Sequence, residues 1–337
     1  MAVTKGAKMM EATYFQPIIG HEGIKQQLLQ VTAKGRLPHA LIFAGPAGIG
    51  KTMMACALAS SLLGRAVFTN LQEQQAVPLL ADQDDAFYLG PVGAMLKVDQ
   101  FRQLQSQLML EGQAGHYSVA IIDHVETMNT EFANRMLKIL EEPPPQVVFI
   151  LITDQPALLL PTIISRCAVI HFDPVPDDEM MSGLIRLRGG TREDYEKAVL
   201  WGDGIVAAVL EFLQGTGQDS VQYALEFLQI TATHACPYAK WLTISLSLSD
   251  ETTRDTLRWM SMFVRDMVVL RSGAAAYIRL KQYKDDMVNL LPYWDDAALF
   301  QVQRVFADAQ EGLIRHVNTR LIWDYVSLQC INAKGGD

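Results

Sequence analysis

Short apolar runs alternate with helical segments along the first half of the chain. The helical segments, such as residues 51–63 and 130–142, repeat apolar positions with the period of an α-helix. The apolar runs end at glycine or polar residues and are typical of buried strands. They lie at residues 39–44, 119–123, 147–153 and 168–172. Strands that alternate with helices predict a parallel sheet covered by helices on both faces.

The strand pattern stops at Pro174 and Pro176, and the sequence from there to about residue 331 has helical periodicity. A change of this kind at a proline-containing connection is typical of a domain boundary. A second change, near Pro237, precedes longer helical patterns. We therefore expect three parts, at residues 1–174, 175–235 and 236–337.

The composition is that of a globular protein with more than one compact unit. The chain has 337 residues, of which 50% are apolar and 19% are charged. Its apolar runs are far shorter than the roughly 18 residues that a membrane helix needs. Its first residues lack the apolar core of a secretion signal. We therefore expect a cytoplasmic protein with no membrane partner.

Charge and cysteine content narrow the possible chemistry. With 28 basic and 37 acidic residues the net charge is −9, so contact with DNA cannot depend on a strongly basic surface. The four cysteines are far apart and contain no C-x-x-C pair, which argues against disulfides and against a zinc site. The histidines also show no ligand pair with a metal-binding spacing. We expect no zinc.

A glycine-rich loop joins the first predicted strand to the helix that follows it. Residues 45–52 match G-x-x-x-x-G-K-[ST], the Walker A motif, in which backbone amides surround phosphate oxygens. Lys51 is expected to contact the β- and γ-phosphates of ATP, and Thr52 to hold Mg²⁺. The flanking strand and helix argue against a chance match. The predicted nucleotide-binding residues of the loop are Gly45, Pro46, Ala47, Gly48, Ile49, Gly50, Lys51 and Thr52.

The apolar run at residues 119–122 ends in Asp123, the position of a Walker B carboxylate. Beside a Walker A loop, this carboxylate is expected to bind Mg²⁺ together with Thr52. Without that loop, Asp123 could equally well be an aspartate that ends a strand or caps a helix. An active ATPase of this kind normally follows it with a glutamate that activates water. Here the next residue is His124, and Glu126 lies two positions further on. We therefore expect weak or absent ATP hydrolysis.

Several motifs together resemble the clamp-loader family of bacterial DNA polymerase III, which includes the delta prime and gamma/tau subunits. The order and spacing of the motifs are those of the family. The most specific are the Leu-Glu-Glu-Pro-Pro segment at residues 140–144 and the Ser-Arg-Cys triplet at residues 165–167. The others are residues 15–20, 37–40, 45–52, 134–139, 263–273 and 318–321. The length of the chain suits the delta prime branch.

The resemblance implies an α/β P-loop core of the AAA+ type, followed by an all-α lid and an all-α collar for oligomerisation. It implies a hetero-oligomer with gamma/tau and delta subunits, which loads the sliding clamp onto primed DNA during DNA replication. ATP and Mg²⁺ would be its ligands. The chain would work as part of the DNA polymerase III holoenzyme, a DNA-directed DNA polymerase.

The resemblance also assigns roles to single residues. Arg166, in the Ser-Arg-Cys triplet, would be an arginine finger directed at the nucleotide of a neighbouring subunit. Thr153, at the end of the third predicted strand, is at the position of sensor one. Ala207 stands where the family's lid arginine would align, so that contact is missing.

One departure and two alternatives remain. Many relatives carry a four-cysteine zinc module within the segment that matches residues 65–97, but this segment has no cysteine, and we expect a reshaped or partly mobile insertion.

The leading hypothesis is a delta prime-like subunit that binds ATP and acts as a stator. The alternative is an active motor ATPase of the gamma/tau type. A P-loop kinase or an unrelated remodeller would leave the Ser-Arg-Cys triplet and the collar-like end unexplained.

Overall fold

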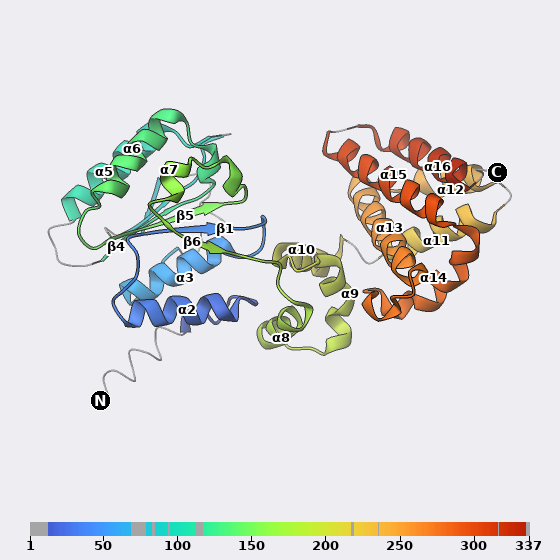
Figure 1. The fold of residues 1–337 in the computed structure, drawn as a ribbon, viewed down its shortest axis with the longest axis horizontal. Coiled ribbons are helices and arrows are strands. Elements are labelled where there is room, and N and C mark those ends of the chain that lie inside the picture. The colour runs from blue at the N-terminus through green and yellow to red at the C-terminus, as the bar shows by residue number, and fades with distance from the viewer. Residues whose placement is uncertain are drawn as a thin grey trace. The chain divides into compact units, whose positions relative to one another are not determined.

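The computed structural model describes residues 13–68, 79–82, 85–93, 95–111, 117–216, 219–234, 236–315 and 317–334. The chain forms two compact units, Met1–Ala208 and Val209–Asp337. The first unit contains the sheet, and the second is built from helices (Figure 1). The predicted fold class, an α/β core with a parallel sheet followed by all-helical chain, is confirmed.

The sheet has six strands in the order β2-β3-β4-β5-β1-β6. Every neighbouring pair is parallel except β2 and β3, which are antiparallel. All residues of β1, β4 and β5 are buried, because these central strands are covered on both faces. The strands are β1 (Ala40–Ala44), β2 (Leu79–Asp82), β3 (Ala86–Leu89), β4 (Ser118–Ile122), β5 (Val147–Thr153) and β6 (Ala168–His171).

Helices cover the two faces of the sheet in separate layers (Figure 1). Alternate residues of each strand point to opposite faces, so Ile42 packs in one apolar cluster and its neighbour Phe43 in the other. Helices α5 (Val98–Glu111), α6 (Thr130–Glu141) and α7 (Pro161–Ile164) cover the first face. Helices α2 (Glu22–Ala33) and α3 (Lys51–Leu63) cover the second.

Two strands within residues 65–97 are absent from the sequence prediction, which anticipated a reshaped insertion there. Strands β2 and β3 have four residues each and lie in a polar region, so no long apolar run marks them. Arg65 forms ion pairs with Asp82 and with Asp85, at the two sides of the connection between β2 and β3. These contacts attach the hairpin to the chain that follows α3.

The first unit also contains helices that follow the sheet. They are α8 (Asp177–Arg188), α9 (Arg192–Gly202) and the first part of α10 (Val206–Glu211). A capping box opens α9, and the amide and the hydroxyl of Thr191 both donate to Oδ2 of Asp194. Arg186 of α8 donates to the carbonyl oxygen of Ile18 at 3.0 Å, which fixes these helices to the start of the core.

The second unit is an all-helical bundle. Its helices are α11 (Ser220–Thr233), α12 (Pro237–Ser245), α13 (Asp250–Arg271), α14 (Lys284–Leu290), α15 (Asp296–Ile314) and α16 (Thr319–Lys334). Four tryptophans are fully buried in it: Trp241, Trp259, Trp294 and Trp323. They are therefore core residues rather than surfaces for stacking nucleic-acid bases.

The boundary between the units differs from the boundaries drawn from the sequence. Helix α11, which we assigned to the lid at residues 175–235, packs against α13 of the second unit. Its apolar face also contacts α12 of the same unit, where the ring of Trp241 lies 4.9 Å from that of Phe227. The division into core, lid and collar remains a prediction. Within the described residues, no helix is both long enough and apolar enough to cross a membrane.

Asp255 of α13 makes the stability of the second unit depend on pH. Burial is the main cause that raises the pKa of Asp255 to about 6, and the charge of Glu251 is the second. The folded unit thus holds this proton more tightly than the unfolded chain does. The free energy of unfolding should therefore fall as pH rises from about 4 to about 6, and then level off with respect to this group.

The variant Asp255→Asn is expected to lose this pH dependence and to be more stable than the wild type at pH 7. Urea unfolding at several pH values, followed by tryptophan fluorescence, measures it, because the four fully buried tryptophans lie in this unit. The exposed Asp285→Asn is the matched control. Parallel pH profiles for wild type and Asp255→Asn would contradict the prediction.

Candidate nucleotide-binding site

The Walker A loop lies between β1 and α3, at the carboxyl end of the central strands. Its backbone needs glycine for steric reasons. Gly48 and Gly50 have φ angles of 72° and 109°, in the left-handed region that side chains disfavour. A Cβ on Gly45 would lie 2.4 Å from the carbonyl oxygen of Phe172. The loop is therefore fixed in a curled conformation at the start of α3, where amide groups and the helix dipole favour a phosphate.

Lys51, the first residue of α3, has its ammonium group inside the loop. Its Nζ donates to the carbonyl oxygens of Gly45 and Pro46 at 2.8 and 2.7 Å and to Oδ1 of Asp154 at 2.7 Å. The Lys51 side chain is only 4% exposed. An incoming phosphate must therefore replace these contacts before it can use the lysine.

Asp154 was missed by the sequence analysis. It directly follows Thr153, the last residue of β5, and β5 lies next to β1 in the sheet. This position after a strand could have pointed to Asp154 in the sequence, because polar residues that follow neighbouring parallel strands meet at one edge of the sheet.

The structure brings together the two predicted Mg²⁺ ligands. Thr52 Oγ1 donates to Oδ2 of Asp123 at 3.4 Å. Tyr88, from β3, donates its hydroxyl to the same carboxylate oxygen at 2.6 Å. Burial, followed by the charge of Asp123, raises the pKa of Tyr88, so the hydroxyl stays protonated and remains a donor. The sequence could not point to Tyr88 because β3 itself was not predicted.

Tyr88→Phe is expected to destabilise the first unit. The change leaves the buried Asp123 carboxylate without its short hydrogen bond, and a hydrogen bond to a charged group contributes about 1.5–3 kcal/mol. Urea unfolding followed by circular dichroism gives the difference, with Tyr117→Phe as the control because Tyr117 is 44% exposed. Equal losses in the two variants would show that the hydrogen bond does not matter.

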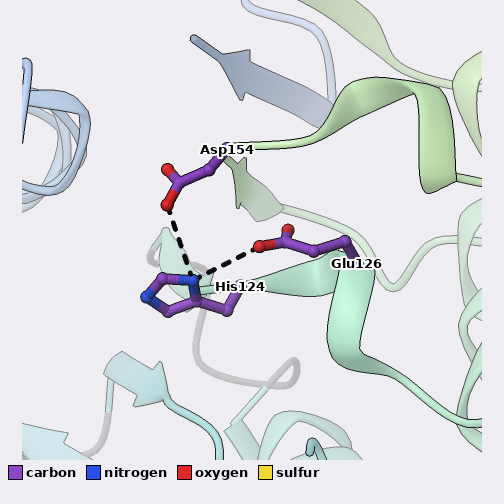
Figure 2. Close-up of side chains that lie close together, drawn as sticks. All are labelled: His124, Glu126 and Asp154. Carbon is purple, nitrogen blue, oxygen red and sulfur yellow. Dashed lines mark hydrogen bonds and ion pairs between the residues drawn. The ribbon is translucent and has the colours of Figure 1, made fainter. Parts of the chain in front are cut away.

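His124 occupies the position where a catalytic glutamate was expected. Its backbone is left-handed, with φ 52°, and its amide donates to Oδ1 of Asp123 at 2.9 Å. The ring is turned toward two carboxylates (Figure 2): Nδ1 lies 3.3 Å from Oε1 of Glu126 and 3.9 Å from Oδ2 of Asp154. His124 and Glu126 therefore contact each other.

Two further contacts complete the surroundings of the loop. Nε2 of His21 donates to the carbonyl oxygen of Ile49 at 3.1 Å, and burial lowers the pKa of His21, so the ring is neutral at pH 7. The amide of Ala207 donates to the carbonyl oxygen of Gly48 at 2.9 Å. Ala207, which stands where the family's lid arginine would align, thus contacts the loop through its backbone.

Residues 20–176 match the family model described as DNA polymerase III, delta subunit. Subunit delta' of Bacillus subtilis is 34% identical over 45% of this chain and 47% of its own length. Subunit delta' of Pseudomonas aeruginosa is 40% identical over 41% of this chain and 44% of its own length. The gamma/tau subunit of Mycobacterium tuberculosis is 28% identical over 68% of this chain and 39% of its own. Over part of its length, the chain is similar to the delta' and gamma/tau subunits of DNA polymerase III. It spans about half the length of the delta prime relatives that it matches.

Solved structures resemble the chain only loosely. A DNA polymerase III gamma subunit-related protein from Thermotoga maritima covers 91% of the chain, and the chain covers 99% of that protein, at 16% identity and a TM-score of 0.43. The Thermotoga maritima RuvB Holliday junction branch migration motor covers 82%, with 89% of its own length matched, at 14% identity and a TM-score of 0.43. Likeness at this level supports no functional assignment.

The predicted roles of two other residues remain proposals. Thr153 is fully buried, and its Oγ1 accepts a hydrogen bond from the amide of Gln155 at 3.1 Å. Arg166 follows α7 and is 35% exposed. Its guanidinium donates to Oε1 of Glu141 at 2.7 Å and to the carbonyl oxygen of Thr162 at 2.9 Å. An arginine finger would therefore start from an ion pair within its own chain.

Proposed function

We propose that this chain is a delta prime-like subunit of a bacterial clamp loader, which binds ATP with Mg²⁺ and assists clamp loading more than it drives it. The match of residues 20–176 to the delta subunit family supports the assignment to this complex. The partners would be gamma/tau and delta subunits, the sliding clamp and, through the assembled complex, primed DNA. The place of action would be the cytoplasm.

The observation that carries the stator role is the side chain after Asp123. In place of a free carboxylate, His124 is engaged with Glu126 and lies close to Asp154. Glu126 is itself only 6% exposed, which keeps it from reaching a water molecule in front of the loop. The curled Walker A loop and the approach of Thr52 to Asp123 support binding of ATP with Mg²⁺, and the engaged His124 supports slow turnover.

The second candidate function is a motor ATPase of the gamma/tau type. It is favoured by the gamma/tau match, which covers 68% of this chain, more than the delta prime matches cover. The two functions differ in the turnover rate of the isolated chain. A stator lacks both the base and a finger directed at its own nucleotide.

The isolated chain is therefore expected to bind ATP and to hydrolyse it far more slowly than the enzyme median of about 10 s⁻¹. A nucleotide titration and a steady-state ATPase assay on the same preparation measure both quantities. The chain is then mixed with candidate gamma and delta subunits, and complex formation is followed by size-exclusion chromatography. A rate near the median would favour the motor, and failure to enter any such complex would overturn the clamp-loader assignment.

A further inference from the structure

Three side chains from separate positions in the sequence meet beside the Walker A loop (Figure 2). His124 follows β4, Glu126 lies in the short 3-10 helix η1 (Val125–Thr127), and Asp154 follows β5. One ligand atom from each residue lies within 4.8 Å of the others. Nδ1 of His124 is the common neighbour, 3.3 Å from Glu126 Oε1 and 3.9 Å from Asp154 Oδ2.

The cluster contains a buried carboxylate whose bonding is incomplete. The Glu126 side chain is 6% exposed, and its Oε2 has no hydrogen-bond partner. A buried polar atom without a hydrogen-bond partner is unfavourable, and more so when it carries charge. A cation bound by both oxygens of this carboxylate would supply the interaction that Oε2 lacks. His124 is 44% exposed, so the cluster is open to solvent on its side and an ion can enter.

We propose that His124, Glu126 and Asp154 form a binding site for a divalent first-row transition metal ion of the zinc type. One imidazole and two carboxylates are ligands that such ions accept, and catalytic zinc sites use three protein ligands and leave a fourth position for water. Metal–ligand distances of about 2.0–2.2 Å place neighbouring ligands of a tetrahedral ion about 3.3–3.5 Å apart. The separation of 3.3 Å between His124 and Glu126 falls in this range, and that of 3.9 Å between His124 and Asp154 is somewhat longer. All three ligand atoms lie within 4.8 Å of one another, so Asp154 must move closer to the other two ligands when the ion binds.

The charge around the cluster favours a cation. The two carboxylates are partly balanced by Lys51, whose ammonium contacts Oδ1 of Asp154. Oδ2 of Asp154 faces His124, so the lysine and a metal ion can use different oxygens of one carboxylate. The usual alternative, an ion pair of a protonated His124 with its neighbours, leaves Glu126 Oε2 without a partner.

This site is distinct from the predicted Mg²⁺ position at Thr52 and Asp123. Asp123 directs Oδ2 to Tyr88 and Thr52, and its Oδ1 accepts from the amide of His124 rather than facing the ring. The sequence analysis found no histidine in a ligand pair, because it could not place Asp154 beside His124. Asp154 is 30 positions from His124 in the numbering but is brought to it by the pairing of β4 with β5.

Calorimetric titration with Zn²⁺ and visible absorption with Co²⁺ test the proposal on the full-length, nucleotide-free protein, purified without a histidine tag. The background is Cys236→Ser, because Cys236 is an exposed thiol that would bind zinc on its own. One ion per chain is expected. His124→Ala and Glu126→Gln should each weaken binding by at least about tenfold, since even residues that only orient metal ligands contribute 10- to 100-fold.

Two controls separate this site from other cation positions. His171→Ala removes an exposed histidine at the end of β6 and should leave the titration unchanged. Asp123→Asn should also retain Zn²⁺ binding, whereas loss in this variant alone would assign the ion to the Walker site and overturn the proposal. Equal affinity in wild type, His124→Ala and Glu126→Gln, or no binding of either ion, would overturn it as well. Circular dichroism confirms that each variant is folded. If His124→Ala does not fold, the isosteric Glu126→Gln decides the test.

Discussion

Arg166→Ala is expected to leave folding and complex assembly intact while strongly lowering ATP hydrolysis by an assembled clamp loader. Arg166 follows α7 at the end of an element, is 35% exposed, and has a guanidinium that can pair with phosphate oxygens. In other nucleotidases such fingers contribute roughly 10³–10⁵ in rate, so hydrolysis at the site that this finger serves should fall by about 10³-fold. The measurement is ATPase activity with primed DNA and clamp, after size-exclusion chromatography has confirmed an intact complex.

The ion pair with Glu141 supplies the matched control. The two side chains are 35% and 51% exposed, and a pair this exposed contributes about 0–1 kcal/mol, so the guanidinium can leave it when a phosphate is offered. Glu141→Gln should therefore retain full activity or raise it slightly. Unchanged hydrolysis in an intact Arg166→Ala complex would assign Arg166 to this local ion pair and remove the finger. Equal losses in both variants would point to a structural effect at the end of α6.

Lys51→Ala is expected to abolish most ATP binding by the isolated chain. The ammonium is the main positive charge inside the loop, and its loss removes charge-assisted contacts to the β- and γ-phosphates. With about 1.5–3 kcal/mol for each hydrogen bond to a charged group, a loss of at least about 100-fold in affinity should follow. Titration with a fluorescent ATP analogue, with Mg²⁺ as the only divalent cation, gives the two dissociation constants. Equal affinities would mean that the loop does not hold phosphate in this chain.

Asp154→Asn should act in the opposite direction. The carboxylate competes with phosphate for Lys51 at 2.7 Å and adds a negative charge next to the loop. Its neutralisation is expected to tighten ATP binding by about tenfold, equivalent to about 1.4 kcal/mol. Weaker binding in this variant would show that Asp154 positions the lysine for nucleotide instead of holding it away.

The predictable part of the fold is the part with long, uniform patterns. The four apolar runs became β1, β4, β5 and β6, and the helix expected at residues 130–142 is α6, one residue shorter. The Walker A loop and Asp123 could be located because their function fixes residue type and spacing. Strands β2 and β3 were missed because four-residue strands among polar residues leave no period to detect.

The missing parts of the site depend on contacts across the sheet. Tyr88 reaches Asp123 only because β3 pairs with β4, and Asp154 reaches Lys51 only because β5 pairs with β1. Neither tyrosine nor aspartate is unusual at such positions, so their types carried no signal. The burial that leaves Glu126 Oε2 without a partner also follows from packing and cannot be read from the sequence.

The bond between Ala207 and Gly48 separates two functions that a lid arginine would combine. An arginine would both touch the nucleotide and join the lid to the loop, so its replacement would sever the two together. Here the connection is a hydrogen bond between main-chain atoms. A Cβ on Gly48 would lie 2.7 Å from the Cβ of Ala207, so glycine at position 48 allows the two backbones to approach this closely. Because this attachment uses main-chain atoms, it does not depend on an arginine side chain at position 207.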